Sequence, residues 1–372
     1  MIIAGEASGD LHGAGLATSL KSRFKKAFLY GVGSDAMHAA GVRLLLDAKE
    51  LAVVGITEVV SKLPTIYRAL GTVKKAMHCL RPDLLILIDF PDFNFRAAAI
   101  ARQLNIPVLY YISPQIWAWR QNRVKKIKRL VDHMAVILPF ETAFYRNHNV
   151  PVTFVGHPLL DRIPPPSSSS AKESFAEETV IGLLPGSRGK EVAALLPVML
   201  QAAQLIQQKK PSIKVLASCS TSIDAVFLES IVEPYTDSLD LQVVKGDVAP
   251  VFTKSRLLIA ASGTVTLEAA LHGIPTIIVY KVSPLSYWLG KRLIKVGYIG
   301  LANLIAQKEL FPELIQGKAD PTIIAATATD LLDDHERYNK IKEELAGIRK
   351  LLGGTGASDR VAAIAQQLIG RT

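Results

Sequence analysis

An aspartate that directly follows a strongly apolar run is the first candidate for chemistry. In the stretch RPDLLILIDFPDFN, the five apolar residues 84–88 predict a buried central strand, and Asp89 follows its last residue. A carboxylate in such a place is costly unless it is used. Capping the next helix is the alternative role for Asp89, but Asp92 or Asn94 is better placed to cap that helix. Asp89 is therefore our candidate for a catalytic base.

A glycine turn in the second half of the chain could bind an anion. The stretch VIGLLPGSRGKEV predicts a strand, a turn and a helix, with Gly186, Ser187 and Arg188 in the turn. Backbone N–H groups at a helix start, together with a guanidinium that can bind two phosphate oxygens, suit a diphosphate. The residue order is not that of an ATP-hydrolysing P-loop. An arginine exposed in an ordinary turn is the alternative interpretation.

The stretch RLLIAASGTVTLEAAL repeats this design further along the chain. Ser262, Gly263 and Thr264 follow a predicted strand and offer more N–H groups to a phosphate. Glu268 lies one turn into the next helix, where it could accept the hydroxyls of a ribose. A glutamate that simply interacts with the helix dipole is an equally good interpretation.

The opening stretch MIIAGEASGDLHGAGL has the pattern of a phosphate-binding turn but carries acids in it. Met1 stands close to the first glycine, which predicts a first strand of about four residues. If a phosphate binds in the second half, Glu6 and Asp10 are free to hold sugar hydroxyls or to orient an acceptor, and we place Ser8 with them. Glu6 close to Asp89 would help to keep one carboxyl basic, since two close acids resist ionising together.

The sequence indicates neither a metal site nor a disulfide scaffold. Asp89 and Asp92 are three positions apart, and no histidine or further carboxylate nearby completes a site for a hard cation. Cys79 and Cys219 are the two cysteines, and their spacing is not that of a zinc or redox motif. We expect no metal and no cofactor, and a reducing cytosol as the compartment.

The elements that must position these residues form two similar halves. Short apolar strands alternate with helices in both, which predicts two α/β, Rossmann-like, doubly wound parallel domains whose ligands bind at the carboxyl ends of the strands. A proline- and serine-rich stretch near residues 161–178 predicts a linker. We therefore expect a first domain over 1–160, a second over 179–345, and a C-terminal helix over 346–372 that crosses back to the first domain. The predicted strands lie in these stretches: AFLYGVG, DLLILID, VLYYIS, HMAVILP and VTFVGHP, then VIGLLPG, IKVLAS, LQVVKG, RLLIAAS and PTIIVY.

The charge of the chain points to an anionic partner of the first half. Residues 1–160 hold 20 Lys and Arg against 11 Asp and Glu, a surplus of nine out of the net +10 of the whole chain. No basic-then-apolar leader and no apolar run long enough to span a bilayer is present. The segment RQNRVKKIKR lacks interleaved aromatic residues, so we expect no nucleic acid there and instead a patch that faces phosphate or a membrane.

One stretch of the first half predicts an amphipathic helix with a basic rim. In VVGITEVVSKLPTIYRALGTVKKAM, apolar residues recur at helical intervals beside lysines and an arginine, which suits the surface of an anionic membrane. A helix that faces the core is the alternative. The residues that we expect at the membrane are Ile56, Val59, Val60, Leu63 and Ile66.

Several of these motifs occur together in one family. The stretches GEASGDLHGAGL, IDFPDFN, ISPQIWAWRQNRVKKIKR, LLPGSRGKEV, ASGTVTLEAAL and YWLGKRLIKVGYIGLANLI resemble those of the lipid-A-disaccharide synthases, family 19 glycosyltransferases, over essentially the whole chain. The resemblance implies a GT-B fold in which the first domain binds the acceptor and the second the sugar nucleotide. The family's catalytic aspartate falls on Asp89, and its other matching site residues fall on Glu6, Arg188, Glu268 and Asn303.

The resemblance also implies the reaction and the partners. UDP-2,3-diacylglucosamine and 2,3-diacylglucosamine 1-phosphate would give the β-1,6-linked disaccharide 1-phosphate and UDP, on the cytoplasmic side of the inner membrane with peripheral attachment. A homodimer stays open, because the final segment could pack on its own chain or on a neighbour. A UDP-sugar 2-epimerase and a nucleotide-sugar-binding module without catalysis are the alternative functions.

Overall fold

The computed structural model describes residues 1–51, 56–165, 179–221, 223–283, 287–288, 290, 292 and 296–370, and over residues 56–63 it describes the helix without its side chains. The chain divides into two compact units. Unit 1 combines Met1–Asp161 with Leu352–Thr372, and unit 2 is Arg162–Leu351. Residues 166–178 of the expected linker lie outside the described residues.

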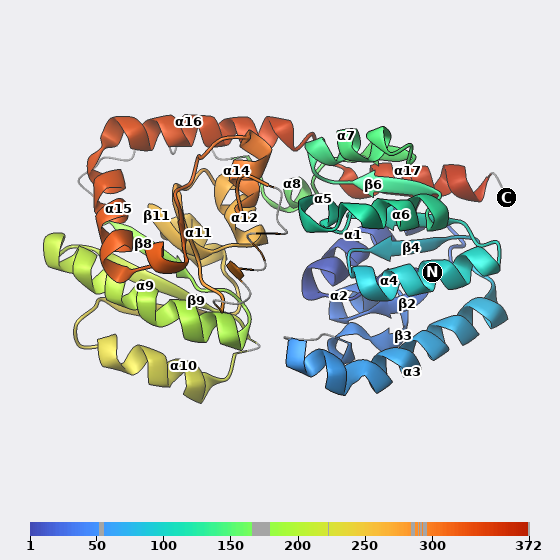
Figure 1. Cartoon of the computed structure of the whole chain (residues 1–372), viewed down its shortest axis with the longest axis horizontal. Helices are drawn as coiled ribbons and strands as arrows, with labels where there is room; N and C mark the ends of the chain where they lie inside the picture. The colour runs from blue at the N-terminus through green and yellow to red at the C-terminus, as the bar shows by residue number, and fades with distance from the viewer. Residues whose placement is uncertain are drawn as a thin grey trace. The chain divides into compact units, whose positions relative to one another are not determined.

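Unit 1 is built on a parallel sheet. Its described strands have the order β3-β2-β1-β4-β5-β6-β7, and Figure 1 shows helices in front of this sheet and behind it. The strands are β1 (Ile2–Ala4), β2 (Tyr30–Gly33), β3 (Arg43–Asp47), β4 (Leu85–Ile88), β5 (Val108–Tyr111), β6 (His133–Val136) and β7 (Val152–Phe154). The helices are α1 (Ala7–Arg23), α2 (Asp35–Ala39), α3 (Ile56–Leu80), α4 (Pro91–Gln103), α5 (Ile116–Trp119), α6 (Val124–Leu130), α7 (Pro139–Asn147), α8 (Leu159–Arg162) and α17 (Ala357–Ile369).

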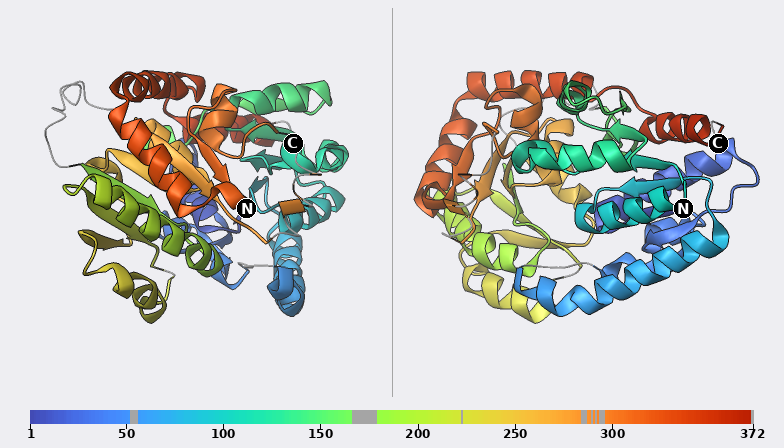
Figure 2. Two further views of the ribbon diagram at one scale, coloured as in Figure 1. Left: turned by 60° about the vertical axis from the view of Figure 1, so that its left-hand side comes forward. Right: turned by 45° about the vertical axis from the view of Figure 1, so that its right-hand side comes forward.

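Alternate residues of the buried strands face different helices. Leu85, Leu87, Val108 and Tyr110 belong to one apolar core together with residues of α3, α4 and α6. The other face of the sheet is covered by α1 and by the C-terminal helix α17, which pack against each other and lie side by side in Figures 1 and 2. Each central strand is therefore apolar on both sides, as a doubly wound sheet requires.

Unit 2 repeats this architecture with its own sheet. The described strands have the order β10-β9-β8-β11-β12-β13, all parallel where they pair. They are β8 (Val180–Leu184), β9 (Lys214–Cys219), β10 (Leu241–Lys245), β11 (Leu257–Ala261), β12 (Thr276–Tyr280) and β13 (Glu313–Ile315). The helices are α9 (Gly189–Lys209), α10 (Ala225–Val232), α11 (Ala249–Lys254), α12 (Thr264–Leu271), α14 (Leu301–Ala306), α15 (Pro321–Asp333) and α16 (His335–Leu351).

The predicted fold class is confirmed by these two parallel sheets. Every stretch predicted as a strand contains one, whereas the edge strands β3 and β13 were not predicted. The C-terminal segment was expected from residue 346, but α16 continues to Leu351 before the chain enters unit 1.

Each sheet has a point where its strand order reverses. In unit 1 this point lies between β1 and β4, where Ala4 pairs with Ile88. In unit 2 it lies between β8 and β11, where Leu184 pairs with Ala260. Ligands of open α/β sheets bind outside the carboxyl ends of the strands at such points.

Candidate active site

The sequence places its candidate residues at these two reversal points. Glu6 follows β1 and Asp89 follows β4 in unit 1, while the turn with Arg188 follows β8 and the turn with Gly263 follows β11 in unit 2. In each unit, two loops that are far apart along the chain thus follow neighbouring strands. They lie at the carboxyl ends of these strands, where a doubly wound sheet binds its ligand.

Asp89 lies in a strained turn. Its φ is 43° and that of Phe90 is 48°, and across the neighbouring strand end Ile112 has a φ of 63°. The N–H of Asp89 donates to the carbonyl of Ile112 over 3.3 Å. Non-glycine residues in this region cost about 1–2 kcal/mol each, and a β-branched isoleucine is rare there. Strain of this kind clusters at functional sites.

Asp89 does not cap the helix that follows it. Phe90 is the N-cap residue of α4 and makes no side-chain cap. The expectation that Asp92 or Asn94 caps this helix is wrong. The Asp92 carboxylate instead accepts from Arg123 Nη2 over 2.8 Å, and the Asn94 amide donates to the carbonyls of Ile88 and Asp89.

The Asp89 carboxyl is poised near neutral pH. Burial raises its pKa to about 6, the nearby Glu6 carboxylate acts in the same direction, and the N–H of Phe90 opposes both. The predicted closeness of Glu6 and Asp89 is confirmed by this interaction. A carboxyl with a pKa of about 6 is mostly ionised at neutral pH and basic enough to take a proton from a hydroxyl.

The glycine of the opening turn makes room for an aromatic ring. A Cβ on Gly5 would lie 2.1 Å from Cγ of Phe90, the residue after Asp89. Glu6 is the N-cap residue of α1 and is exposed, as is Ser8. Gly5 therefore leaves the space that the Phe90 ring occupies, next to the turn that carries Asp89.

Asp10 has a structural task. It is 5% exposed, and its carboxylate accepts from the N–H groups of Ser34, Ala36 and Met37 over 2.6, 2.9 and 3.2 Å. Both oxygens thus satisfy the amino end of α2. We therefore leave Asp10 out of the proposed acceptor site.

In unit 2 the turn before α9 already holds a carboxylate. Gly186 has a φ of 104°, and a Cβ there would lie 2.2 Å from Oε2 of Glu191. The N–H groups of Ser187 and Arg188 donate to this carboxylate, while burial is the larger influence and raises its pKa. Glu191 is not among the residues predicted from the sequence, although a glutamate three residues after the N-cap position is a known capping signal.

The second turn of unit 2 is more open. Gly263 and Thr264 are exposed, and the Ser262 hydroxyl donates to the carbonyl of Ile299 over 3.2 Å. Glu268 is half-buried in α12, where burial raises its pKa and Arg162 opposes the shift. Its interaction with a ribose stays a prediction.

Asn303 lies within a fully bonded network. Its amide nitrogen donates to the Phe311 carbonyl and to Glu313 Oε1 over 2.8 and 2.9 Å, and its oxygen accepts from the N–H groups of Leu310 and Phe311. Asn303 is completely buried. The structure thus assigns it to the support of this loop, and we leave it out of the proposed sugar site.

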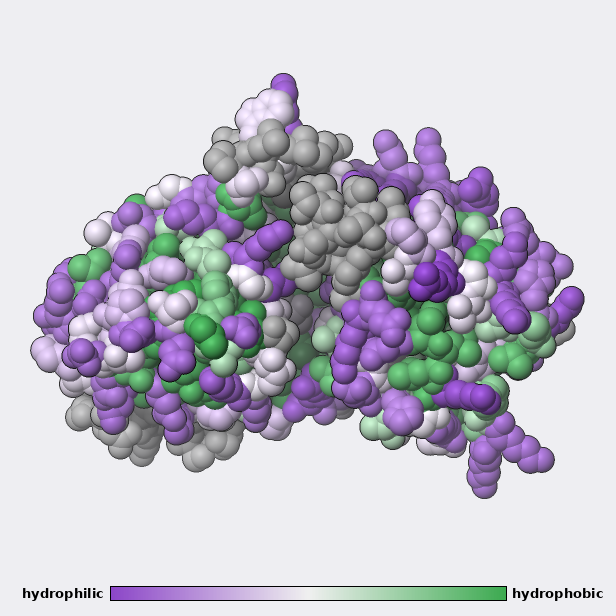
Figure 3. All heavy atoms as spheres, turned by 90° about the horizontal axis from the view of Figure 1, so that it is seen from below, coloured by the Kyte–Doolittle hydropathy of each residue, from purple (hydrophilic) through white to green (hydrophobic). Residues whose placement is uncertain are grey.

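Of the predicted membrane residues, Ile56, Val59, Val60 and Leu63 have side chains that lie outside the described residues. Ile66 is half-buried and packs against the apolar core of unit 1, which favours the core-facing alternative at this position, and its contact with a membrane stays a prediction. On the face drawn in Figure 3, hydrophilic side chains surround smaller groups of hydrophobic ones.

Cations of the basic segment 120–129 and of α4 lie beside aromatic rings. Arg120 lies 4.0 Å from the ring centroid of Trp119, which is 43% exposed, and Arg96 lies 5.2 Å from that of Tyr67, which is 59% exposed. Lys126 lies beside Arg96 and Arg123. Exposed aromatic rings with adjacent cations are typical of membrane interfaces.

Among the residues that the structure describes, no group of three or more His, Cys, Asp or Glu could hold a metal ion. None of the helices that the structure describes combines the length and the apolar character of a membrane span.

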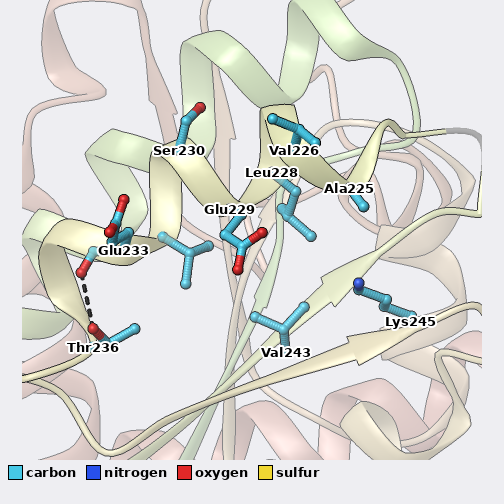
Figure 4. Close-up of a pocket in the computed structure, with 10 residues that line it drawn as sticks. Ala225, Val226, Leu228, Glu229, Ser230, Glu233, Thr236, Val243 and Lys245 are labelled. Carbon is cyan, nitrogen blue, oxygen red and sulfur yellow. Dashed lines mark hydrogen bonds between the residues drawn. The ribbon is translucent and has the colours of Figure 1, made fainter.

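A pocket of unit 2 lies away from these loops. It has a volume of about 640 Å³ and lies between α10 and the edge strand β10, with Val226 and Val243 among its lining residues (Figure 4). It contains neither strand end at the reversal point of the sheet, and we assign it no part in the site.

The family of the chain follows from comparison with known proteins. A sequence profile described as lipid-A-disaccharide synthetase matches residues 1–367. A lipid-A-disaccharide synthase of Geobacter metallireducens is 45% identical over 377 residues, which cover 100% of this chain and 97% of the relative. The chain belongs to the lipid-A-disaccharide synthase family. One of Coxiella burnetii is 41% identical over 374 residues, or 99% of this chain and 98% of the relative.

Solved structures support the fold. The structure titled S. aureus MnaA-UDP co-structure has a TM-score of 0.68 at 12% identity and covers 100% of this chain and 97% of its own. The calicheamicin glycosyltransferase CalG4 has a TM-score of 0.62 at 14% identity and covers 100% and 97%. At these identities the likeness shows the two-domain glycosyltransferase fold alone, whereas membership of the synthase family identifies the chain as a glycosyltransferase.

Proposed function

We propose that this chain joins UDP-2,3-diacylglucosamine to 2,3-diacylglucosamine 1-phosphate, giving the β-1,6-linked disaccharide 1-phosphate and UDP. The observation that carries the proposal is the Asp89 carboxyl, which lies at the reversal point of its sheet with a pKa raised to about 6 by burial and by Glu6. Unit 1 would bind the acceptor and unit 2 the sugar nucleotide.

In this mechanism Asp89 acts as the general base. Its carboxylate takes the proton of the acceptor hydroxyl while the hydroxyl oxygen bonds to the anomeric carbon of the donor. The bond between that carbon and the diphosphate oxygen breaks on the opposite face, so the configuration inverts. General-base assistance contributes about 10²–10⁴ in rate.

The leaving diphosphate requires positive charge and N–H donors. We assign this task to Arg188 and to the turns with Gly186, Ser187 and Ser262–Gly263–Thr264, and we assign the ribose to Glu268. Preorganised donors of this kind contribute about 3–4 kcal/mol each to a transition state. The reaction needs no metal in this scheme.

The diphosphate would have to displace a carboxylate of the protein. Glu191 accepts from the N–H groups of Ser187 and Arg188 and lies against Gly186. Because two anions do not share one set of donors, Glu191 must leave the turn when the diphosphate enters it.

We further propose peripheral attachment to the cytoplasmic face of an anionic inner membrane. Both substrates carry acyl chains, and Arg96 and Arg120 beside the exposed rings of Tyr67 and Trp119 support such contact. Attachment of this kind requires no membrane span.

The test of the proposed function is UDP release from the acylated donor in the presence and absence of the acylated acceptor. We expect release that depends on the acceptor, with disaccharide 1-phosphate as the second product. Asp89→Ala and Arg188→Ala should each lower kcat by at least about a hundredfold while melting remains cooperative. Interconversion of the free UDP-sugar without the acceptor would instead indicate an epimerase, and UDP-sugar binding without turnover would indicate a binding module.

A further inference from the structure

Two buried polar side chains converge on the backbone of Asp89. The Tyr110 hydroxyl donates to the Asp89 carbonyl over 2.6 Å, and the Asn94 amide donates to the same carbonyl over 2.7 Å. The Asn94 amide also donates to the Ile88 carbonyl over 3.2 Å. Neither side chain is exposed to solvent. Side chains from two different elements, α4 and β5, thus donate to the same carbonyl oxygen.

The carbonyl that they hold belongs to a strained turn. Asp89 and Phe90 both have a positive φ, a conformation that residues with a side chain leave unless their surroundings fix it. The ladder between β4 and β5 ends at Ile88 and Tyr111, and beyond it one long backbone bond joins the two strand ends, from the Asp89 N–H to the Ile112 carbonyl over 3.3 Å. The two side-chain bonds begin where the ladder ends.

We propose that Asn94 and Tyr110 are positioning residues, which hold the left-handed turn of Asp89 and Phe90 and thereby direct the Asp89 carboxyl toward the reacting hydroxyl. This inference rests on the proposed role of Asp89 as the base. Burial raises the pKa of the Tyr110 hydroxyl well above its ordinary value, so this hydroxyl remains a donor over the working pH range.

The charged groups around the turn determine what its loosening would do. Glu6 from α1 acts on Asp89 directly, and Tyr110 from β5 is itself influenced by Asp89 and Asp92. Asp92 from α4 is paired with Arg123. If the turn relaxes, the Asp89 carboxyl loses burial and moves away from Glu6, and its pKa falls from about 6 toward the ordinary value of 3.8.

The experiment compares pH profiles of kcat/KM for acceptor-dependent UDP release. Tyr110→Phe removes one oxygen and keeps the ring. We expect kcat to fall between about tenfold and a hundredfold, as for a misplaced reacting group. We also expect the acidic limb of the profile to move down by about one pH unit, toward the pKa of a less buried carboxyl. Asn94→Ala should have the same two effects.

Tyr111→Phe is the matched control, because Tyr111 is the next residue of the same strand and is equally buried. Neighbouring strand residues face opposite sides of the sheet, so this variant loses a buried hydroxyl without touching Asp89. We expect its pH profile to match that of the wild type.

The outcomes separate the inference from the proposed function. The proposed positioning role would be overturned if Tyr110→Phe and Asn94→Ala both keep the wild-type kcat and the wild-type acidic limb of the kcat/KM profile. This holds even if Asp89→Asn is inactive. A shifted limb that appears equally in Tyr111→Phe would also overturn it, because a general loss of stability would then explain the shift. Full activity of Asp89→Asn would overturn the proposed base itself. If Tyr110→Phe fails to fold, Asn94→Ala with its melting temperature decides the question.

Discussion

Replacement of Glu191 by glutamine should increase the affinity of the chain for UDP. Glu191 occupies the N–H groups of the turn before α9, and the diphosphate must displace it if it binds there. The substitution keeps the size of the side chain and an oxygen that can accept from the turn, but it removes the charge. In the absence of UDP, the N–H groups of the turn therefore bind the side chain of residue 191 less strongly in the variant. Their attraction for the diphosphate is unchanged.

The size of this effect can be worked out from the contacts. A hydrogen bond to a charged acceptor contributes about 1.5–3 kcal/mol and one to a neutral acceptor about 0.5–1.5 kcal/mol, so each of the two N–H groups gains about 1 kcal/mol for an incoming anion. The sum of about 2 kcal/mol corresponds to a Kd that is lower by roughly thirtyfold.

Calorimetric titration with UDP at constant pH and ionic strength measures this directly. Glu229→Gln is the control, because Glu229 is an exposed acid within α10 of the same unit and belongs to neither of the two turns assigned to the diphosphate. Its Kd should equal that of the wild type. A Kd of Glu191→Gln that is equal to or higher than the wild-type value would refute the proposed displacement.

Three further predictions concern unit 1. Glu6→Gln should move the acidic limb of the kcat/KM profile to lower pH. The limb should move by less than the full distance from about 6 to 3.8, because burial is the larger cause of the raised pKa of Asp89. An unmoved limb would contradict the interaction between Glu6 and Asp89. Gly5→Ala should lower the free energy of unfolding by about 1–3 kcal/mol in urea titration and lower kcat as well, since its Cβ would collide with the Phe90 ring. Gly71→Ala, whose Cβ would meet nothing within 4 Å, should be neutral or stabilising, and equal losses in the two variants would exclude the collision as the cause. The protein should bind vesicles with anionic lipids and be released at about 1 M salt, where charges are screened beyond about 3 Å; sedimentation that is the same with neutral vesicles would speak against the electrostatic contribution.

The strands of this fold were predictable where they are buried on both faces. Runs such as residues 84–88 are apolar without interruption, and no other environment suits them as well. The edge strands β3 and β13 gave no such signal, whereas β7 and β10 at the opposite edges were predicted. Arg43 begins β3, whose residues are exposed or half-buried, and β13 is three residues long with a glutamate at its start. Strands such as β3 and β13 are recognised by the neighbour that they pair with, and this neighbour is set by the tertiary structure.

The position of Asp89 was predictable for the same reason, but the partners of the site residues were not. Asp10 bonds to residues 24 to 27 positions away, and Tyr110 bonds to a carbonyl 21 positions away. Such partners depend on which strands become neighbours. A motif therefore indicated that Asp10 and Asn303 matter, while the structure alone showed that their hydrogen bonds are directed inward.

The acids of the opening turn are explained by what its glycine does. In many doubly wound folds a glycine after the first strand lets the backbone approach a phosphate. Here the space beside Gly5 is filled by the Phe90 ring, which belongs to the same strained turn as Asp89. A cation in this turn would lower the pKa of Asp89, whereas Glu6 raises it. The opening turn of unit 1 thus resembles a phosphate-binding turn in its glycine, but its space is taken by the turn of the proposed base, in keeping with our proposal that unit 2 binds the diphosphate.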